Sequence, residues 1–537
     1  MVAERLNRRD FLTGSAGVVA GALAAGSGLA CRGSAHSDLS RMNVVIIMVE
    51  DTTAGALGGF GNDIVRTPAL DALAAEGVRF DRAYCQASGC NASRSSYLTG
   101  LRPDTTRVFG NRDRMDEGLP AKALTLPEFA DSAGATAVGV GKVFHHAYMA
   151  QKALRAYDRL ELGELPDAYS GVSSGYTPAV GEPLPPAPRF RFSADPATEA
   201  ELVRLKEERD RIHARVEAGS REWLASSHPF RLLHSELVGD SGRTEELMLD
   251  GQRSRLTSQI LGDLARSNER FLLTLGFTTP HVPLVAPREY IDLYDPDTIP
   301  LPPAPPEDDR GVPPVARRFG RNFDLFHTVE PTPDRVRRAI AAYYGCVSFV
   351  DAQVRIVLDA LTREGLDQNT AVLFFADHGF HLGEHGLWSK VTLFEQSTRV
   401  PLIVRVPGAA GNGTVCDGIV ELVDVLPTLA DWWNLETPVP FEGTSFAPLL
   451  DDPSRPWKQA AFSLCKINRQ LLGRAVRTER YRYSEWAAGA GIELYDLAND
   501  PFEQTNLAVD AAMRGVVADH AQLLRAGWRE AKPPAAT

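Results

Sequence analysis

The sequence between residues 43 and 51 reads Asn43-Val44-Val45-Ile46-Ile47-Met48-Val49-Glu50-Asp51. Its apolar, largely β-branched run is typical of a strand that is buried on both faces of a parallel sheet. The run ends in two carboxylates, Glu50 and Asp51. Because open α/β sheets build their sites at the carboxyl ends of strands, the stretch predicts a central strand that presents both acids to a site.

Further apolar runs follow, separated by segments long enough for helices. They cover residues 135–140, 271–277, 371–376 and 401–406. The run over 371–376 again leads into an acidic residue, Asp377. Apolar residues at helical spacing fill residues 67–77 and 334–361. Strands that alternate with helices predict an α/β fold, with a mixed, mostly parallel sheet sandwiched by helices.

The pattern changes in the last part of the chain. Residues 481–486 alternate between apolar and polar side chains, as a half-exposed strand does, and residues 493–497 are expected to pair with them antiparallel. A helix is predicted over 508–526. The sequence therefore predicts a large α/β domain over residues 40–454 and a smaller α+β domain over residues 455–537.

Two long stretches between the predicted strands are rich in proline, which prevents a regular helix or an internal strand. They cover residues 164–196 and 296–316. Long loops within a domain are often functional, so these two are expected to form walls of a substrate cleft. Between them, residues 200–222 have the alternating charges of an exposed helix.

Composition and charge exclude several classes of protein. Of the 537 residues 44% are hydrophobic and 23% are charged, as in an ordinary globular protein, which excludes disorder or a coiled coil for the whole chain. The formal charge of −12 argues against a nucleic-acid-binding protein. The 6 cysteines are too few for a disulfide scaffold, and no particular bridge is predicted. A large acidic enzyme is the expected class.

Residues 1–35 form a separate targeting segment. Arg8 and Arg9 precede a Gly- and Ala-rich apolar stretch over residues 11–30, which is typical of a twin-arginine signal peptide. A membrane anchor is the alternative, because about 20 apolar residues can span a bilayer. Cys31 follows the stretch, and it either leaves with the signal or carries a lipid anchor. The sequence predicts export by the twin-arginine machinery to the periplasm or the cell surface.

The most informative stretch begins at a cysteine. It reads Cys90-Asn91-Ala92-Ser93-Arg94-Ser95-Ser96-Tyr97-Leu98-Thr99-Gly100-Leu101-Arg102-Pro103. This stretch closely resembles the sulfatase signature, Cys-x-Pro/Ala-Ser-Arg followed at fixed spacing by Leu-Thr-Gly. The resemblance implies that a formylglycine-generating enzyme oxidises Cys90 to formylglycine (3-oxoalanine), whose hydrate is the nucleophile. Its second hydroxyl then allows sulfate to be expelled, whereas a serine would be left with a stable sulfate ester.

The same resemblance implies a metal site. Glu50 and Asp51 match the family's paired metal carboxylates, and Asp377 and His378 match its second ligand pair. Together with the modified Cys90 they form an oxygen-rich set of ligands of the kind that holds Ca²⁺, one ion per subunit. The cation would offset the charge of the sulfate and polarise the hydroxyl of the nucleophile.

Basic residues complete the site that the resemblance implies. Arg94 would pair with the formylglycine hydroxyl or with the metal carboxylates, because its planar fork suits oxyanions. Lys142 and Lys390 match the residues that hold the sulfate oxygens. His281 would protonate the leaving alcohol, and His145 would remove the proton that drives elimination, since the pKa of imidazole lies near working pH.

The matching motifs cover residues 43–405, and further matches extend to about residue 507. They are most similar to the iduronate-2-sulfatase branch, through residues 103–107, residues 141–145 and His378. The resemblance implies an alkaline-phosphatase-like α/β fold with a small C-terminal sheet domain. It also implies release of sulfate from a sulfated, acidic carbohydrate such as a glycosaminoglycan.

Two positions depart from the family pattern, and two other functions stay open. Glu50 stands where Asp is usual, and Ala92 replaces the commoner Pro. Calcium tolerates variable ligation, so a shifted site is expected rather than a lost one. A phosphonate monoester or phosphodiester hydrolase of the same superfamily would act on an ester of similar tetrahedral shape. An exported binding protein with a decayed site is the non-enzyme alternative, which only Glu50 favours.

Overall fold

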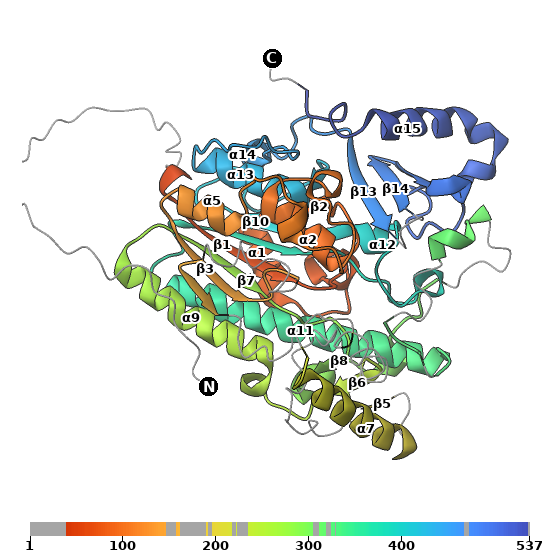
Figure 1. The fold of residues 1–537 in the computed structure, drawn as a ribbon, viewed down its shortest axis with the longest axis horizontal. Coiled ribbons are helices and arrows are strands. Elements are labelled where there is room, and N and C mark those ends of the chain that lie inside the picture. The colour runs from red at the N-terminus through yellow and green to blue at the C-terminus, as the bar shows by residue number, and fades with distance from the viewer. Residues whose placement is uncertain are drawn as a thin grey trace, which may run out of the picture.

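A mixed β-sheet forms the centre of the protein (Figure 1). The computed structural model describes residues 39–145, 157–161, 190–191, 196–216, 222, 235–303, 311–317, 324–327, 329–466 and 472–534. Among these residues the strand order is β11-β2-β10-β9-β1-β7-β3-β4, and β12 also pairs with β2. The strands are β1 Asn43–Val49, β2 Val78–Tyr84, β3 Thr136–Gly141, β4 Arg159–Glu161, β7 Phe271–Gly276, β9 Thr370–Ala376, β10 Arg399–Arg405, β11 Thr414–Cys416 and β12 Val420–Glu421.

β1 lies between two parallel neighbours. Ile46 pairs with Thr274 of β7 on one side and with Leu373 of β9 on the other. Every residue of β1 is buried, which explains why its sequence shows no alternation of apolar and polar side chains. β10 is antiparallel to β9. The prediction of a mixed, mostly parallel sheet is therefore confirmed.

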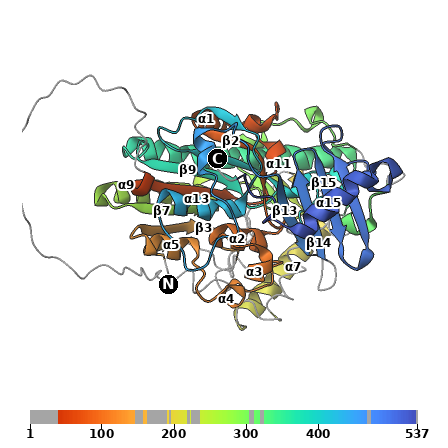
Figure 2. The same ribbon diagram turned by 90° about the horizontal axis from the view of Figure 1, so that it is seen from above.

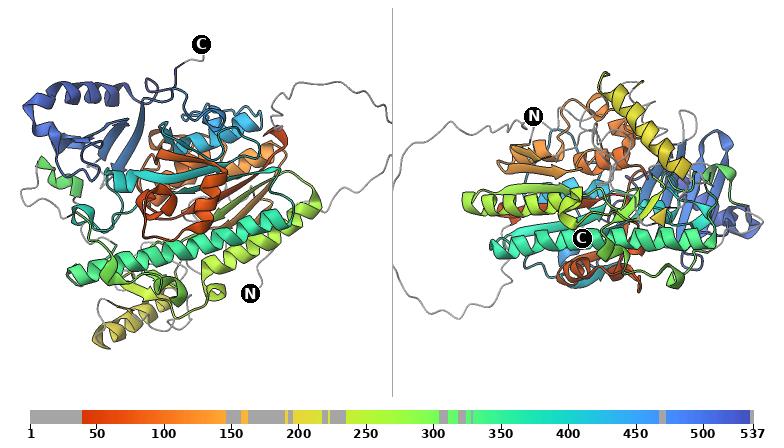
Figure 3. Two further views of the ribbon diagram at one scale, coloured as in Figure 1. Left: turned by 180° about the vertical axis from the view of Figure 1, so that it is seen from behind. Right: turned by 90° about the horizontal axis from the view of Figure 1, so that it is seen from below.

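Helices cover both faces of this sheet. α9 and α11 run side by side along one face, and α5, α13 and α14 lie over the other (Figures 1 and 3). The helices are α1 Pro68–Glu76, α2 Cys90–Thr99, α3 Pro103–Thr106, α4 Met115–Gly118, α5 Leu126–Ser132, α7 Pro196–His213, α9 Leu249–Ser267, α10 Arg288–Ile291, α11 Pro333–Arg363, α12 Glu395–Thr398, α13 Val425–Trp432, α14 Ala447–Asp451 and α15 Arg514–Ala526. Asp351 of α11 accepts the backbone N–H groups of Ala69 at 3.1 Å and Leu70 at 2.8 Å, so α11 caps the start of α1.

A separate antiparallel sheet forms the C-terminal part (Figure 2). Its order is β13 Ala460–Lys466, β14 Leu472–Thr478, β15 Tyr481–Trp486 and β16 Gly491–Asp496, and α15 packs on it. Ala87 and Leu464 form a parallel bridge, and the N–H of Leu464 donates to the carbonyl of Gln86 at 2.9 Å. This sheet is therefore fixed beside the loop that leads into α2. A third, small sheet contains β5 Phe190–Arg191, β6 Leu237–Asp240 and β8 Leu284–Ala286.

Two helices differ in extent from their predictions. The helix predicted over 508–526 begins only at Arg514, because Asn506 and Asp510 accept nearby backbone N–H groups and stabilise short 3₁₀ turns instead. The helix predicted over 200–222 is α7, which begins earlier, at Pro196, and ends at His213.

Several predictions fall outside the described residues. They include the signal segment with Arg8, Arg9 and Cys31, and most of the loop predicted over 164–196. Export and the domain boundary after residue 454 also stay predictions. Within the described part of the chain, no helix combines the length and the apolar composition that crossing a bilayer requires. All five cysteines in that part are free thiols.

Candidate active site

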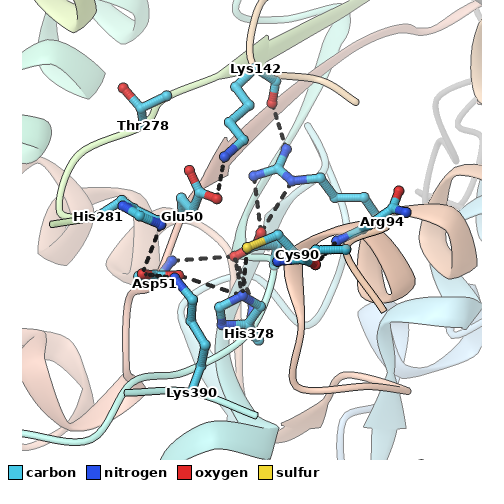
Figure 4. A network of polar contacts seen from close by, with 12 residues as sticks. Glu50, Asp51, Cys90, Arg94, Lys142, Thr278, His281, His378 and Lys390 are labelled. Carbon is cyan, nitrogen blue, oxygen red and sulfur yellow. Dashed lines mark hydrogen bonds and ion pairs between the residues drawn. The ribbon is translucent and has the colours of Figure 1, made fainter. Parts of the chain in front are cut away.

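Polar side chains gather at the carboxyl ends of β9, β1, β7 and β3 (Figure 4). Because these four neighbouring strands are parallel, their ends share one edge of the sheet. The residues brought there are Glu50 and Asp51 after β1, Asp377 and His378 after β9, Lys142 after β3, and His281 in the loop after β7. All six are buried.

Cys90 is brought to the same edge by α2, which it begins. Its sulfur lies 3.2 Å from Nε2 of His378. The hydroxyl of Ser93 donates to the carbonyl of Asp377, so α2 is tied to the end of β9. Burial, and next the charge of Glu50, raises the pKa of the Cys90 thiol well above its usual value. The unmodified thiol is therefore protonated and a poor nucleophile.

Three cations balance the three carboxylates of the site. The pairs are Lys142 with Glu50, Lys390 with Asp51, and Arg94 with Asp377. Burial alone would raise the pKa of Glu50, but the charges of Lys142, His281 and Arg94 hold this pKa well below its usual value. Glu50 is thus ionised, and each of the three carboxylates lies against a cationic side chain.

Two buried carboxylate oxygens in this cluster accept no hydrogen bond from the residues that the structure describes. They are Oε2 of Glu50 and Oδ1 of Asp51, and burying such an oxygen is costly unless a cation meets it. Ligand atoms of Asp51, Cys90 and His378 lie within 4.8 Å of one another, as do those of Glu50, Asp51 and His281. Nδ1 of His378 lies 2.9 Å from a backbone carbonyl, so it carries the proton and Nε2 faces the cluster. This donor set fits a hard cation such as Ca²⁺.

Asp377 lies beside this cluster with both carboxylate oxygens engaged. Its Oδ1 accepts the backbone N–H of His378 at 2.9 Å and that of Asp51 at 3.3 Å. Its Oδ2 accepts Nε of Arg94 at 3.1 Å. The carboxylate thereby fixes the ends of two strands and the helix α2 relative to one another. Its role as a metal ligand stays a prediction.

The two predicted catalytic histidines also lie at the cluster. Nδ1 of His281 lies 2.9 Å from a backbone carbonyl, which can only accept, so the proton sits there and Nε2 faces the site. That Nε2 is 3.8 Å from Oδ2 of Asp51. Burial lowers the pKa of His281. A ring nitrogen of His145 lies within 4.8 Å of ligand atoms of Glu50 and Cys90.

Sequence reasoning missed two residues that shape the site. Asp250 accepts the backbone N–H groups of Thr278 at 3.1 Å and Thr279 at 2.8 Å, and so fixes the loop after β7. The hydroxyl of Tyr343 donates to the carbonyl of Asp51 at 2.6 Å and holds that residue at a positive φ of 53°. In the sequence, Asp250 cannot be told apart from an ordinary acidic residue in the first turn of a helix. Tyr343 lies within the apolar pattern of α11 and carries no signal of its own.

Gly141, at the end of β3, has no room for a side chain. Its φ is +70°, and a Cβ there would lie 2.4 Å from the carbonyl oxygen of Gly276 and 2.7 Å from Cδ of Arg253. Gly141→Ala is expected to lower the free energy of unfolding by about 2–4 kcal/mol, because the left-handed backbone and the clash both act against the folded state. Denaturant unfolding measures the loss.

Gly134→Ala is the matched control for this prediction. Gly134 has a similar φ of +68°, but nothing lies within 4 Å of the position of its Cβ. Only the backbone cost remains, which is about 1–2 kcal/mol. Equal losses in the two variants would contradict the close approach at Gly141.

Comparison with known proteins gives consistent matches over most of the chain. Residues 42–435 match the sulfatase family, and residues 383–528 match the family described as N-sulphoglucosamine sulphohydrolase, C-terminal. The chain is 29% identical to a sulfatase from Formosa agariphila, over 88% of this chain and 84% of that protein. It is 28% identical to human iduronate 2-sulfatase, over 89% of this chain and 93% of that protein. Among solved structures, the phosphonate monoester hydrolase from Silicibacter pomeroyi is 25% identical with a TM-score of 0.68, over 91% of this chain and 95% of that one.

The sulfatase match spans the whole cluster, from Glu50 through the Cys90 motif to Lys390. The mostly parallel sheet between helices, with its small C-terminal sheet, is the alkaline-phosphatase-like fold that the sequence predicted. The expectation of an enzyme is confirmed as well. The chain therefore belongs to the sulfatase family of the alkaline phosphatase superfamily and is a sulfuric ester hydrolase.

Proposed function

We propose that this protein releases sulfate from a sulfated, acidic carbohydrate, using a formylglycine made from Cys90 and one Ca²⁺. The observation that carries the proposal is the buried cluster at the start of α2. There Cys90 lies within 4.8 Å of ligand atoms of Glu50 and Asp51, and three cations pair with the carboxylates of the cluster. Within the described part of the chain, one oxygen of Glu50 and one of Asp51 accept no hydrogen bond. Fixed cations in a buried site stabilise an anionic group far better than water does.

Cys90 is suited to be a modified residue rather than a thiol nucleophile. Its pKa is raised well above the usual value by burial, so the thiolate that would attack or bind metal is scarce. Oxidised by a formylglycine-generating enzyme, residue 90 would supply a hydrated aldehyde as an oxygen nucleophile. Ser93 and Arg94 then hold the start of α2 against Asp377, which keeps residue 90 aimed at the cluster.

Glu50, Asp51 and His378 are the residues that we assign to the Ca²⁺, with Asp377 beside them. Bound there, the cation would offset the charge of the substrate and lower the pKa of an adjacent hydroxyl. Glu50 is one methylene longer than the usual Asp, yet its carboxylate lies within 4.8 Å of the ligand atoms of Asp51 and His281. We infer that this departure preserves the metal site.

The remaining side chains have roles that follow from their positions. Lys142 and Lys390 already contact the carboxylates of the cluster, so they are placed to share their charge with sulfate oxygens. His281 presents Nε2 to the site, where Oδ2 of Asp51 lies 3.8 Å away and its charge favours protonation of the ring. In the imidazolium form, which carries a proton on Nε2 as well as on Nδ1, this atom would give a proton to the leaving alcohol. His145, near residue 90, would take the proton from its hydroxyl.

An acidic sugar is the substrate class that the relatives support. Human iduronate 2-sulfatase, by its name, acts on a sulfated uronate, and the alignment with it covers 89% of this chain and 93% of that protein. We therefore propose a uronate-containing substrate of the glycosaminoglycan kind.

Phosphonate monoester hydrolysis is the second candidate, because the Silicibacter pomeroyi enzyme has a similar fold at 25% identity. An aryl sulfate and an aryl phosphonate with the same leaving group separate the two functions. For the matured enzyme we expect kcat/KM to be at least about tenfold higher on the sulfate, which is about 1.4 kcal/mol of transition-state preference. A reversed preference would replace the sulfatase proposal with the second candidate.

A further inference from the structure

Lys390 contacts a second carboxylate, Asp324, for which no motif of the sequence accounts. Nζ of Lys390 lies 2.5 Å from Oδ2 of Asp51 and 3.8 Å from Oδ2 of Asp324. Asp324 is 2% exposed and Lys390 is 3% exposed, so one buried cation stands between two buried acids. Such an arrangement fixes the ammonium from two directions.

The segment that carries Asp324 is attached to the segment that carries Lys390 at successive points. The N–H of Asp324 donates to the carbonyl of Trp388 at 3.3 Å, and the hydroxyl of Ser389 lies 3.5 Å from Oδ2 of Asp324. Phe326 packs edge-on against Trp388, with the ring centroids 5.0 Å apart. The carboxylate of Asp324 therefore has a defined place relative to the lysine.

Asp51 cannot serve Lys390 alone if the proposed function is correct. In the proposed function Asp51 also binds Ca²⁺, and its carboxylate is shared between the metal ion and the lysine. A buried ammonium without a full partner is costly, and the flexible stem of lysine lets it move elsewhere. Asp324 lies outside the proposed ligand set, so a metal ion bound there would not draw its carboxylate away from Lys390.

We propose that Asp324 is the positioning residue of Lys390, holding the ammonium where it binds a sulfate oxygen of the substrate. The inference rests on the proposed function, in which Lys390 contacts the sulfate. A carboxylate that acted only through its charge would weaken the binding of an anion. Removal of Asp324 should therefore weaken sulfate binding if the residue positions Lys390, and strengthen it if the residue is merely a nearby negative charge.

A double-mutant cycle tests this. Asp324→Ala is expected to lower kcat/KM on an aryl sulfate about tenfold, and to weaken the affinity for inorganic sulfate, measured by calorimetry, by a similar factor. Lys390→Ala is expected to lower kcat/KM by about 10²–10³-fold. The double variant should match Lys390→Ala, because no ammonium is left to position. Additive losses, or tighter sulfate binding by Asp324→Ala, would overturn the proposal.

Two more variants make the cycle decisive. Asp334→Ala removes the same charge from the exposed start of α11, where Asp334 pairs with Arg338 at 3.0 Å. This variant should change neither kcat/KM nor the affinity for inorganic sulfate. Asp324→Asn keeps the side-chain shape, and it replaces the alanine variant if that variant does not fold. It should show a smaller loss of kcat/KM, and this loss should again disappear when Lys390 is also replaced by Ala. Full activity of Lys390→Ala would refute the proposed role of the lysine itself. A normal Asp324→Ala beside an impaired Lys390→Ala would refute only the positioning role.

Discussion

Cys90→Ser is expected to reduce the turnover of a sulfate ester by about 10⁴-fold or more, because it removes the reacting group itself. A serine hydroxyl could attack sulfur once, but it has no second hydroxyl and would remain as a stable sulfate ester. The variant should therefore release at most one alcohol per chain. Mass spectrometry of the peptide that contains residue 90 should find an aldehyde in the wild type and a sulfate ester in the variant.

Cys85→Ser is the control for this substitution. Cys85 is also buried, and its sulfur lies 3.7 Å from the carbonyl of Ser397. It is not part of any of the groups of potential metal ligands found among the described residues. Loss of this thiol should leave turnover close to that of the wild type. An unmodified thiol at residue 90 in active protein, made in a host able to form formylglycine, would refute the proposed chemistry.

The sheet was predictable from the sequence where its strands are fully buried. β1 and β9 are continuous apolar runs because both faces of each are covered, and each leads directly into an acidic residue, Glu50 or Asp377. α2 was not predicted as a helix, since its sequence is polar and has no apolar face. All its residues are nevertheless buried, because side chains such as Ser93 and Arg94 bond to the end of β9.

The residues of the site could likewise be predicted from the sequence only in part. Residues at strand ends, such as Glu50 and Asp51, could be placed from the sequence because parallel strands align their carboxyl ends. Tyr343, Asp250 and Asp324 reach the site from helices or a connecting segment. Each of these acts through tertiary contacts with residues outside its own element, and no local pattern encodes such pairings.

The charge distribution explains how an acidic protein can bind an anion. The whole chain has a formal charge of −12, but charges on the exposed surface are screened over about 8–10 Å. Within the buried cluster three cations face the carboxylates of Glu50, Asp51 and Asp377, and Asp324 adds a further carboxylate beside Lys390. A divalent cation would outweigh this one additional negative charge, so the metal ion rather than the net charge of the protein would set the local potential.

Calcium should accordingly stabilise the protein and support its activity. A site that is filled at 100 times its Kd adds about 2.7 kcal/mol to the free energy of unfolding, so a calcium chelator should lower the Tm and added Ca²⁺ should restore it. Asp51→Asn is expected to abolish this calcium-dependent rise in Tm, because it removes an ionised ligand. It should also lower turnover by about 10³-fold.

Asp351→Asn separates the loss of a ligand from the loss of a buried charge. Asp351 is 3% exposed, but its carboxylate caps α1 through the N–H groups of Ala69 and Leu70 and lies outside the cluster. This variant should lose stability and keep the full calcium-dependent rise in Tm. The metal assignment is wrong if Asp51→Asn retains that rise, or if both variants lose it equally, since calcium would then act somewhere other than at the carboxyl end of β1.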